Sequence, residues 1–221
     1  MNNLDFSIAL NDLTAHAASH GVTVTAAQGK LLSRYAALLL EWNKKINLIS
    51  RKDEERVFTK HILHSVSVAF FHSFKPAERV LDIGTGGGLP AIPLAILFPE
   101  SLFLGIDSVG KKVAACNDMI AALDLKNITA KKLRVEELKR VQFNTAVSRA
   151  VASMPELCKW VRPLLSQNGS LICLKGGELQ TELDEALILA AESLSFPEHI
   201  DTHSIEFLGD DFKEKFVVVA T

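Results

Sequence analysis

Residues 79–99 constrain the fold most strongly, because an apolar segment, a cluster of glycines and a second apolar segment follow one another directly. They read RVLDIGTGGGLPAIPLAILFP, with the glycines at Gly84, Gly86, Gly87 and Gly88. The first apolar run is typical of a buried parallel strand, and the second favours a helix. Glycines at such a turn let a ligand lie against bare peptide at the start of a helix. The stretch therefore predicts a strand–turn–helix unit that binds a nucleotide-like ligand; a tight turn without a ligand is the alternative.

The spacing of the glycines narrows the choice of ligand. A dinucleotide fingerprint needs G-x-G-x-x-G, and Leu89 stands where the third glycine is required. A phosphate-binding Gly-Lys-Ser/Thr sequence does not follow, and Asp82 would repel a pyrophosphate. S-adenosylmethionine has a cationic sulfonium and amino group and no phosphate, so a carboxylate at Asp82 favours it. We predict S-adenosylmethionine as the cofactor, with Asp82, Gly84, Gly86 and Gly88 at its site.

From residue 76 onward, strand-like and helix-like segments alternate, which is typical of an α/β fold with a parallel sheet. A short Gly209-Asp210-Asp211 turn joins the last two expected strands, so they should form an antiparallel hairpin at the sheet edge. The expected strands are 79–83, 101–107, 127–131, 143–148, 169–175, 203–208 and 214–220. The expected helices are 88–98, 110–123, 134–140, 154–166 and 178–194.

Helical patterns precede the sheet, and Lys75-Pro76 divides an expected helical cap, residues 1–75, from an expected cofactor-binding domain, residues 76–221. The cap has helical patterns over 4–20, from Thr25 onward, and over 53–73, and Thr25 with Gln28 forms a capping-box sequence. In the last of these helices, three basic side chains fall four residues apart and should share one face. They are Arg56, Lys60 and His64.

Candidate binding residues follow the ends of the expected strands, where open parallel sheets bind ligands. Asp107 ends the second strand and can accept hydrogen bonds from both ribose hydroxyls; capping the next helix is the alternative role. Val135 and Glu136 follow the third strand, where an adenine ring can pack. Arg149 follows the fourth strand, and a cation there favours an anionic ligand because burying it unpaired is costly.

Charge is distributed unevenly along the 221 residues, although the net charge is only −2. Residues 30–64 hold eight Lys/Arg against four Asp/Glu, whereas residues 178–221 hold two against eleven. This asymmetry indicates one face for a polyanion and another turned away from it; two ordinary solvated surfaces are the alternative. Cysteines 116, 158 and 173 are widely spaced, and the chain lacks a long apolar run or a signal-peptide pattern. We therefore expect a cytoplasmic protein with reduced cysteines, no metal site and no membrane segment.

Seven segments carry a family resemblance: EWNKKINLIS, KHILHS, DIGTGGGLPAIPLAILFP, GIDSVGKK, RVEEL, VSRAVA and LKGGEL. Together they resemble the bacterial small-subunit ribosomal RNA guanine-N7 methyltransferases, formerly called glucose-inhibited division protein B. The resemblance implies a class I S-adenosylmethionine-dependent, Rossmann-like fold with an N-terminal helical cap. It also implies a guanine in a 16S rRNA hairpin loop as the methyl acceptor. The positions that match cofactor contacts of the family are Gly84, Leu89, Val135, Glu136 and Arg149.

Guanine N7 carries an available lone pair, so its methylation needs orientation more than a general base. The chain fits that chemistry, because it shows no strand-end cysteine nucleophile and no Asn/Asp-Pro-Pro-aromatic loop for an amine acceptor. We expect Arg149 to position cofactor and guanine, and a monomer to bind 16S rRNA or the small ribosomal subunit. A methyltransferase acting on proteins or small molecules and a non-catalytic binding module are the alternatives. The residues expected to hold the RNA backbone are Lys44, Lys45, Arg51, Arg56, Lys60 and His64.

Overall fold

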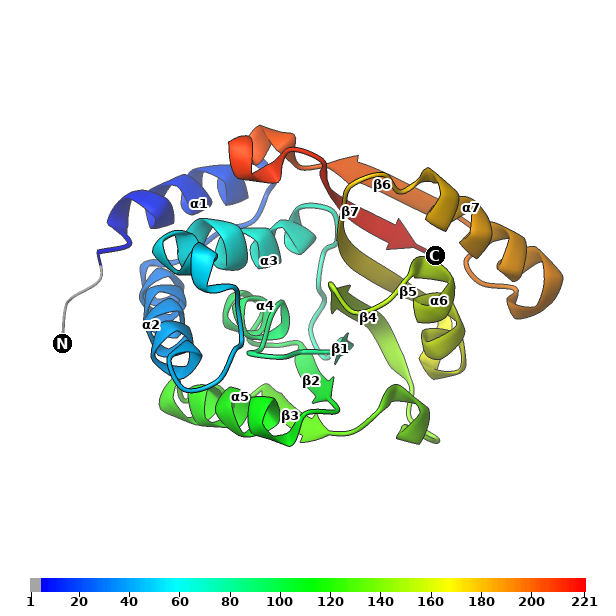
Figure 1. Ribbon diagram of the computed structural model, residues 1–221, viewed down its shortest axis with the longest axis horizontal. Helices are drawn as coiled ribbons and strands as arrows, with labels where there is room; N and C mark the ends of the chain where they lie inside the picture. The colour runs from blue at the N-terminus through cyan, green and yellow to red at the C-terminus, as the bar shows by residue number, and fades with distance from the viewer. Residues whose placement is uncertain (1–4) are drawn as a thin grey trace.

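The computed structural model describes residues 5–221, within which a seven-stranded mixed sheet runs through the centre of the molecule (Figure 1). The strand order is β3-β2-β1-β4-β5-β7-β6; β1 to β5 pair in parallel, and β7 lies antiparallel between β5 and β6. This confirms the expected α/β fold and its C-terminal hairpin. The strands are β1 Arg79–Ile83, β2 Leu102–Asp107, β3 Ile128–Lys132, β4 Phe143–Arg149, β5 Leu165–Gly176, β6 Ile200–Ser204 and β7 Lys215–Ala220.

Helices cover both faces of the sheet, which explains why four of the five residues of the central strand β1 are buried (Figure 1). On one face, Leu13, Tyr35, Ile92 and Met119 belong to a single hydrophobic core. On the other face, side chains of α6 and α7 pack against the strands. The helices are α1 Ser7–Ser19, α2 Ala26–Asn43, α3 His64–Val66, α4 Ala91–Leu97, α5 Gly110–Ala122, α6 Met154–Val161 and α7 Gln180–Leu189.

The expected capping box at the start of α2 is present and also joins α2 to α4. The backbone N–H of Gln28 donates to Thr25 Oγ1 at 3.3 Å, and the backbone N–H of Thr25 donates to Gln28 Oε1 at 2.9 Å. Gln28 Nε2 then donates to the carbonyls of Ile96 and Leu97 at the end of α4, at 3.1 and 3.0 Å. One side chain thus satisfies groups at two helix ends. The helices before residue 76 share a core with the sheet, and their separation as a domain stays a prediction.

The segment expected to be one helix over 53–73 is instead a series of short turns. It consists of a 3₁₀ helix Arg51–Arg56, a π-helix Phe58–Leu63, α3, and a 3₁₀ helix Ser67–Phe70. Hydroxyl groups here bond to the backbone, Ser65 to the His61 carbonyl and Ser67 to the His64 carbonyl, both at 2.7 Å. Such bonds compete with the regular helical ladder. The expected helix over 4–20 begins at Leu4, which lies outside the described residues.

Two further elements differ from the sequence-based expectation. The helix expected over 134–140 is a single 3₁₀ turn, Val135–Glu137, because the Glu137 carboxylate caps the Arg134 amide at 2.6 Å. The strand expected over 203–208 is instead β6, Ile200–Ser204, and Glu206–Leu208 forms a 3₁₀ turn. Pairing of β6 with β7 determines this position, and an alternating pattern alone does not fix the register of a strand.

Gly88 provides a test of packing at the glycine turn. It has a φ of +95°, and an added Cβ would lie 2.3 Å from Ile92 Cδ1. We expect Gly88→Ala to lower the free energy of unfolding by about 2–4 kcal/mol, through backbone strain and overpacking. Gly177, with a φ of +84° and no atom within 4 Å of an added Cβ, is the matched control. Gly177→Ala should lower the free energy of unfolding by about 1 kcal/mol. If urea unfolding gave the same loss of stability for both variants, the clash with Ile92 would not explain the cost at Gly88.

Candidate functional site

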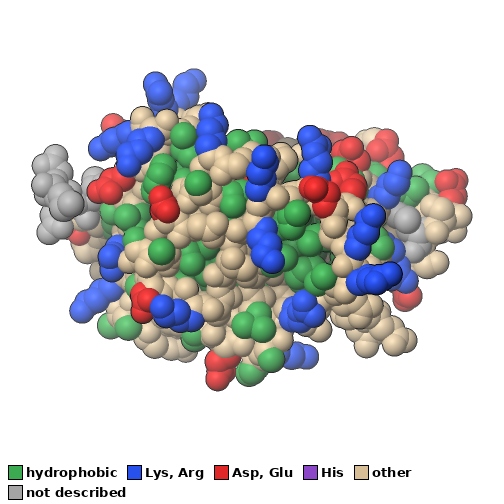
Figure 2. All heavy atoms as spheres, turned by 90° about the horizontal axis from the view of Figure 1, so that it is seen from below, with side chains coloured by type: hydrophobic (Ala, Val, Ile, Leu, Met, Phe, Trp, Pro, Cys, Tyr) green, Lys and Arg blue, Asp and Glu red, His purple; other side chains and the backbone are tan. Residues whose placement is uncertain are grey.

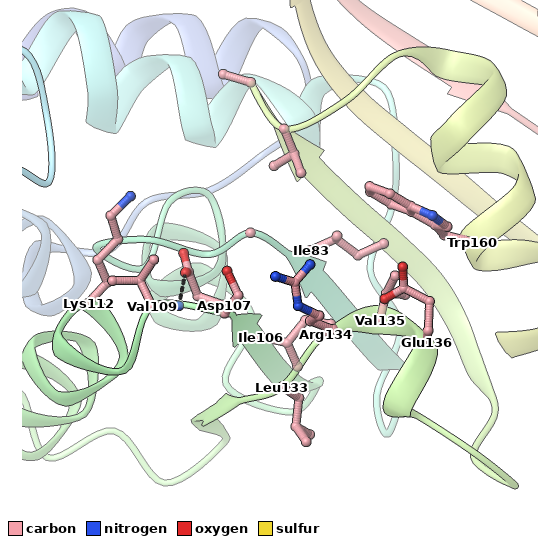
Figure 3. Close-up of a pocket in the computed structure, with 14 residues that line it drawn as sticks. Ile83, Ile106, Asp107, Val109, Lys112, Leu133, Arg134, Val135, Glu136 and Trp160 are labelled. Carbon is pink, nitrogen blue, oxygen red and sulfur yellow. Dashed lines mark hydrogen bonds between the residues drawn. The ribbon is translucent and has the colours of Figure 1, made fainter.

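A cavity of about 350 Å³ opens where the carboxyl ends of β1, β2, β3 and β4 meet, and we call it the first cavity. Figure 3 shows Asp107, Val109 and Lys112 on one side, Arg134 near the centre, and Glu136 and Trp160 on the other side. Its size falls within the usual range of small-molecule sites. The residues lining it are Ile83, Gly84, Ile106, Asp107, Ser108, Val109, Lys112, Leu133, Arg134, Val135, Glu136, Ala150, Val151 and Trp160.

The glycine turn forms one wall of the first cavity through Gly84. The amides of Gly84 and Thr85 both donate to the Ile106 carbonyl at 2.9 Å, which ties the turn to β2. Gly84 has a φ of +71°, and an added Cβ would lie 2.4 Å from Val151 Cγ2. Only a residue without a side chain fits this close approach.

The other turn residues predicted to contact the cofactor have contacts of their own within the protein. The Gly86 amide is bonded to Asp107, Gly88 packs against Ile92, and Leu89 is buried in the core. Within residues 5–221, none of the three turn residues lines the first cavity. Their structural role is to shape the turn, and a direct contact of Gly86, Gly88 or Leu89 with the cofactor stays a prediction.

Asp107 lies at the end of β2, as predicted, and both of its carboxylate oxygens are ordered by backbone amides. Oδ2 accepts from the Gly86 amide at 3.1 Å, and Oδ1 accepts from the Val109 amide at 2.8 Å. The helix-capping role and the ligand-binding role are compatible, because a carboxylate oxygen that accepts one hydrogen bond retains a second lone pair. Since the residue also lines the first cavity, this geometry suits recognition of vicinal hydroxyl groups.

The opposite wall of the first cavity is apolar and includes a residue that the sequence analysis missed. Val135 and Glu136 line the cavity, as expected for the loop after β3. Trp160 from α6 completes this wall (Figure 3). The sequence predicts a helix over this region, but which of its side chains faces the cavity depends on how α6 packs. A flat ring can be held between such a wall and the glycine turn.

Asp82 lies beneath the glycine turn and not in the first cavity. Its side chain is fully buried, and Oδ2 accepts from the Ala91 amide at the start of α4 at 3.2 Å. Burial raises the pKa of Asp82 to about 7. The predicted contact between Asp82 and a cationic cofactor is not supported by this position. The carboxyl group instead fixes the path of the chain from β1 into α4.

A second cavity of about 540 Å³ lies between the cap and the ends of β4 and β5. Ala150 lines both cavities, so the two adjoin at the residue after β4. Arg149 lines the second cavity and not the first; one of its nitrogens, Nη2, lies 2.5 Å from His61 Nδ1. The residues around it are Asp53, Lys60, His61, His64, Arg149, Ala150, Leu174, Lys175, Gly176, Leu179, Glu182, Asp211, Phe212 and Lys215.

The residues predicted to hold RNA fall into two groups. Lys44, Lys45 and Arg51 are exposed at the end of α2 and in the turn that follows it. Lys45 lies over the Trp42 ring, with Nζ 4.5 Å from the ring centre. Figure 2 shows one face of the molecule on which Lys and Arg side chains surround apolar surface, while acidic side chains gather toward one upper corner.

The basic residues further along the cap turn toward the second cavity. Arg56 forms an ion pair with Asp211, and Lys60 Nζ lies 2.7 Å from Asp53 Oδ1. His64 faces the Phe212 ring edge, and burial lowers its pKa to about 3. A neutral, interior His64 does not fit the prediction of a cationic phosphate contact. The three side chains do not form one solvated face, because the segment is not a regular α-helix.

The raised pKa of Asp82 predicts a pH-dependent stability. Between the ordinary value of 3.8 and about 7, the folded protein retains a proton that the unfolded chain releases. The contribution of Asp82 to the free energy of unfolding therefore falls as pH rises through this range. Asp82→Asn keeps an acceptor for the Ala91 amide and cannot ionise, so it should remove this contribution and change the slope of unfolding free energy against pH. Urea unfolding from about pH 5 to about pH 8 measures it; an unchanged slope in the variant would contradict the assignment.

The fold is similar to those of solved methyltransferase structures. A ribosomal protein L11 methylase from Lactobacillus delbrueckii subsp. bulgaricus has a TM-score of 0.56 and 19% identity, covering 73% of this chain and 78% of its own. TrmN from Thermus thermophilus has a TM-score of 0.57 and 18% identity, covering 72% of this chain and 48% of its own. At such identities the likeness shows the fold alone, which is that of class I methyltransferases.

Comparison with related sequences identifies the family, which the likeness in fold does not. The family model GidB, rRNA small subunit methyltransferase G, matches residues 28–206. A protein named ribosomal RNA small subunit methyltransferase G from Chlorobaculum tepidum is 52% identical over 91% of this chain and 93% of its own length. A protein of the same name from Bacteroides thetaiotaomicron is 42% identical over 87% of this chain and 90% of its own length. The chain therefore belongs to the rRNA small subunit methyltransferase G family.

Proposed function

We propose that this protein transfers a methyl group from S-adenosylmethionine to N7 of a guanine in the 16S rRNA of the small ribosomal subunit. The observation that carries the proposal is the pair of adjoining cavities at the strand ends. The first has a carboxylate and a flat apolar wall for a nucleoside, and the second lies against a basic cap. Family membership supports ribosomal RNA as the acceptor.

The residues of the first cavity fit S-adenosylmethionine. The Asp107 carboxylate can accept hydrogen bonds from the two ribose hydroxyls, and Val135 and Trp160 offer an apolar wall for the adenine ring. Gly84 lines the cavity with bare backbone. The bound cofactor supplies an electrophilic methyl group on a sulfonium. Orientation of that methyl toward Ala150 places it at the boundary of the two cavities.

The transfer itself requires no general base. The N7 lone pair forms the new C–N bond while the S–CH₃ bond breaks and its electron pair stays on sulfur. The positive charge moves from the sulfonium to the base, and S-adenosylhomocysteine leaves. The protein's contribution is to align the two reactants and exclude water. This fits a site in which Arg149 is the strand-end cation and a paired acid and base are not needed.

The binding partner, the oligomeric state and the cell compartment belong to the same proposal. We infer that a monomer binds the small ribosomal subunit or its 16S rRNA in the cytoplasm. Within residues 5–221, none of the helices has the length and apolar composition needed to cross a bilayer. Exposed Lys44, Lys45 and Arg51 are suited to hold the RNA backbone, in a salt-dependent and sequence-independent way.

Incubation with labelled S-adenosylmethionine tests the function. The pure protein is offered small ribosomal subunits, naked 16S RNA and a ribosome-free protein extract, and the products are digested to nucleosides or amino acids. We expect label in 7-methylguanosine, from the RNA-containing substrates alone. Label in protein, in another nucleoside or in no product would contradict the proposal.

Asp107→Asn tests the cofactor site. Loss of the negative charge weakens the hydrogen bonds that the ribose donates, so we expect about a tenfold loss of affinity for S-adenosylmethionine. Asp118→Asn, an exposed carboxylate on α5, is the matched control. Calorimetric titration gives both affinities, and thermal unfolding verifies that each variant is folded. Equal affinities in the two folded variants would place the ribose elsewhere.

Replacement of Lys44 and Lys45 by Ala tests the RNA-binding role of the cap. Removal of one lysine–phosphate interaction should reduce the slope of log affinity against log salt by about one, so the slope for the double variant should fall by about two. Affinity for S-adenosylmethionine should not change. Lys213→Ala, exposed in the acidic C-terminal part, is the control. A double variant with the wild-type salt slope would exclude both lysines from the RNA interface.

A further inference from the structure

Unsatisfied nitrogens gather at the second cavity. Among the described residues, three buried side-chain nitrogens lack a hydrogen-bond partner: His61 Nε2, His64 Nε2 and Arg149 Nη1. All three side chains line this cavity. Leaving a buried donor unpaired costs free energy, about 1–3 kcal/mol for a neutral group and more for a charged one. Such a cluster indicates a place where a ligand supplies acceptors.

The cap fixes the direction of the Arg149 guanidinium. Nη2 lies 2.5 Å from His61 Nδ1, so Nδ1 is the acceptor and the ring is neutral. In this tautomer the proton is on Nε2, which lies 3.6 Å from Asp53 Oδ2. Burial lowers the pKa of His61 to about 3, in keeping with a neutral ring. His61 therefore orients the Arg149 guanidinium through Nη2, and the other guanidinium nitrogen, Nη1, is left for a ligand.

The position of Arg149 relates that ligand to the first cavity. Ala150, the next residue, lines both cavities and has a left-handed φ of +55°. This backbone turn separates the Arg149 side chain, on the second cavity, from the entrance to the first. A planar base in the second cavity can thus present one edge to Arg149 and to the cofactor's methyl group together.

We propose that the second cavity receives the acceptor guanine, with O6 accepting a hydrogen bond from Arg149 Nη1 and N7 facing the first cavity. This inference rests on the proposed function. O6 and N7 are neighbours on one edge of guanine, so a single orientation satisfies both contacts. A guanidinium only donates, and adenine carries a donor amine in place of O6. Arg149 therefore selects guanine, and His61 is its positioning residue.

The remaining charges of the cavity are compatible with the reaction. The base gains a positive charge as its N7 accepts the methyl group. Three carboxylates line the second cavity beside its lysines and Arg149: Asp53, Glu182 and Asp211. They offset the repulsion between the guanidinium and the methylated base.

The test compares two acceptor bases in otherwise identical small subunits. Subunits are reconstituted with 16S RNA that carries either guanine or 2-aminopurine, which keeps N7 and the 2-amino group but lacks O6, at the modified position. We expect wild-type kcat/KM to fall roughly 10- to 100-fold with 2-aminopurine. In Arg149→Met, which cannot donate, both substrates should be slow and the ratio should approach one. Equal wild-type rates, or a ratio preserved in Arg149→Met, would overturn the proposal.

A pair of His61 variants keeps the test decisive where Arg149→Met is inactive. His61→Asn places an amide oxygen near the position of Nδ1 and should retain much of the guanine preference. His61→Gln places its amide group farther out and should lose that preference. Loss in both variants, or in neither, would overturn the positioning role, provided thermal unfolding and S-adenosylmethionine affinity are unchanged. Absence of wild-type transfer to guanine-containing subunits would instead contradict the proposed function.

Discussion

The glycine turn after β1 is the constraint on which the rest of the site depends. Its amides are tied to β2 through the Ile106 carbonyl, and the Asp107 carboxylate holds the Gly86 amide from the same strand. From the cap, the Tyr35 hydroxyl donates to the Gly87 carbonyl at 2.8 Å. Strand, turn and cap are therefore fixed against one another. This rigidity sets the first cavity before any ligand enters it.

The cap contributes to the site as well as carrying the exposed lysines that we propose to bind RNA. It supplies His61, which orients Arg149, and it contributes walls of the second cavity. The acidic C-terminal part is not simply turned away from the basic cap, as the charge pattern suggested. Asp211 pairs with Arg56 across the mouth of this region. The two oppositely charged segments are thus in contact beside the second cavity.

Local sequence patterns predict the strands well but do not predict how side chains are oriented between elements. The strands β1 to β4 and the position of the Asp107 carboxylate were predictable, because apolar segments alternate with helical ones and strand ends in a parallel sheet share one edge. The turns of residues 51–70 were not, since the hydroxyls of Ser65 and Ser67 compete for backbone groups. Trp160 and His61 were missed because their roles depend on contacts between distant elements.

Our central claim is that the first cavity holds the cofactor and the second cavity holds the acceptor base, on either side of Ala150. A crystal structure with bound S-adenosylhomocysteine tests this most directly. We predict ribose hydroxyls on the Asp107 carboxylate, adenine beside Val135, and the sulfur facing the second cavity. Sulfur directed away from Ala150, or the nucleoside bound outside the first cavity, would contradict it.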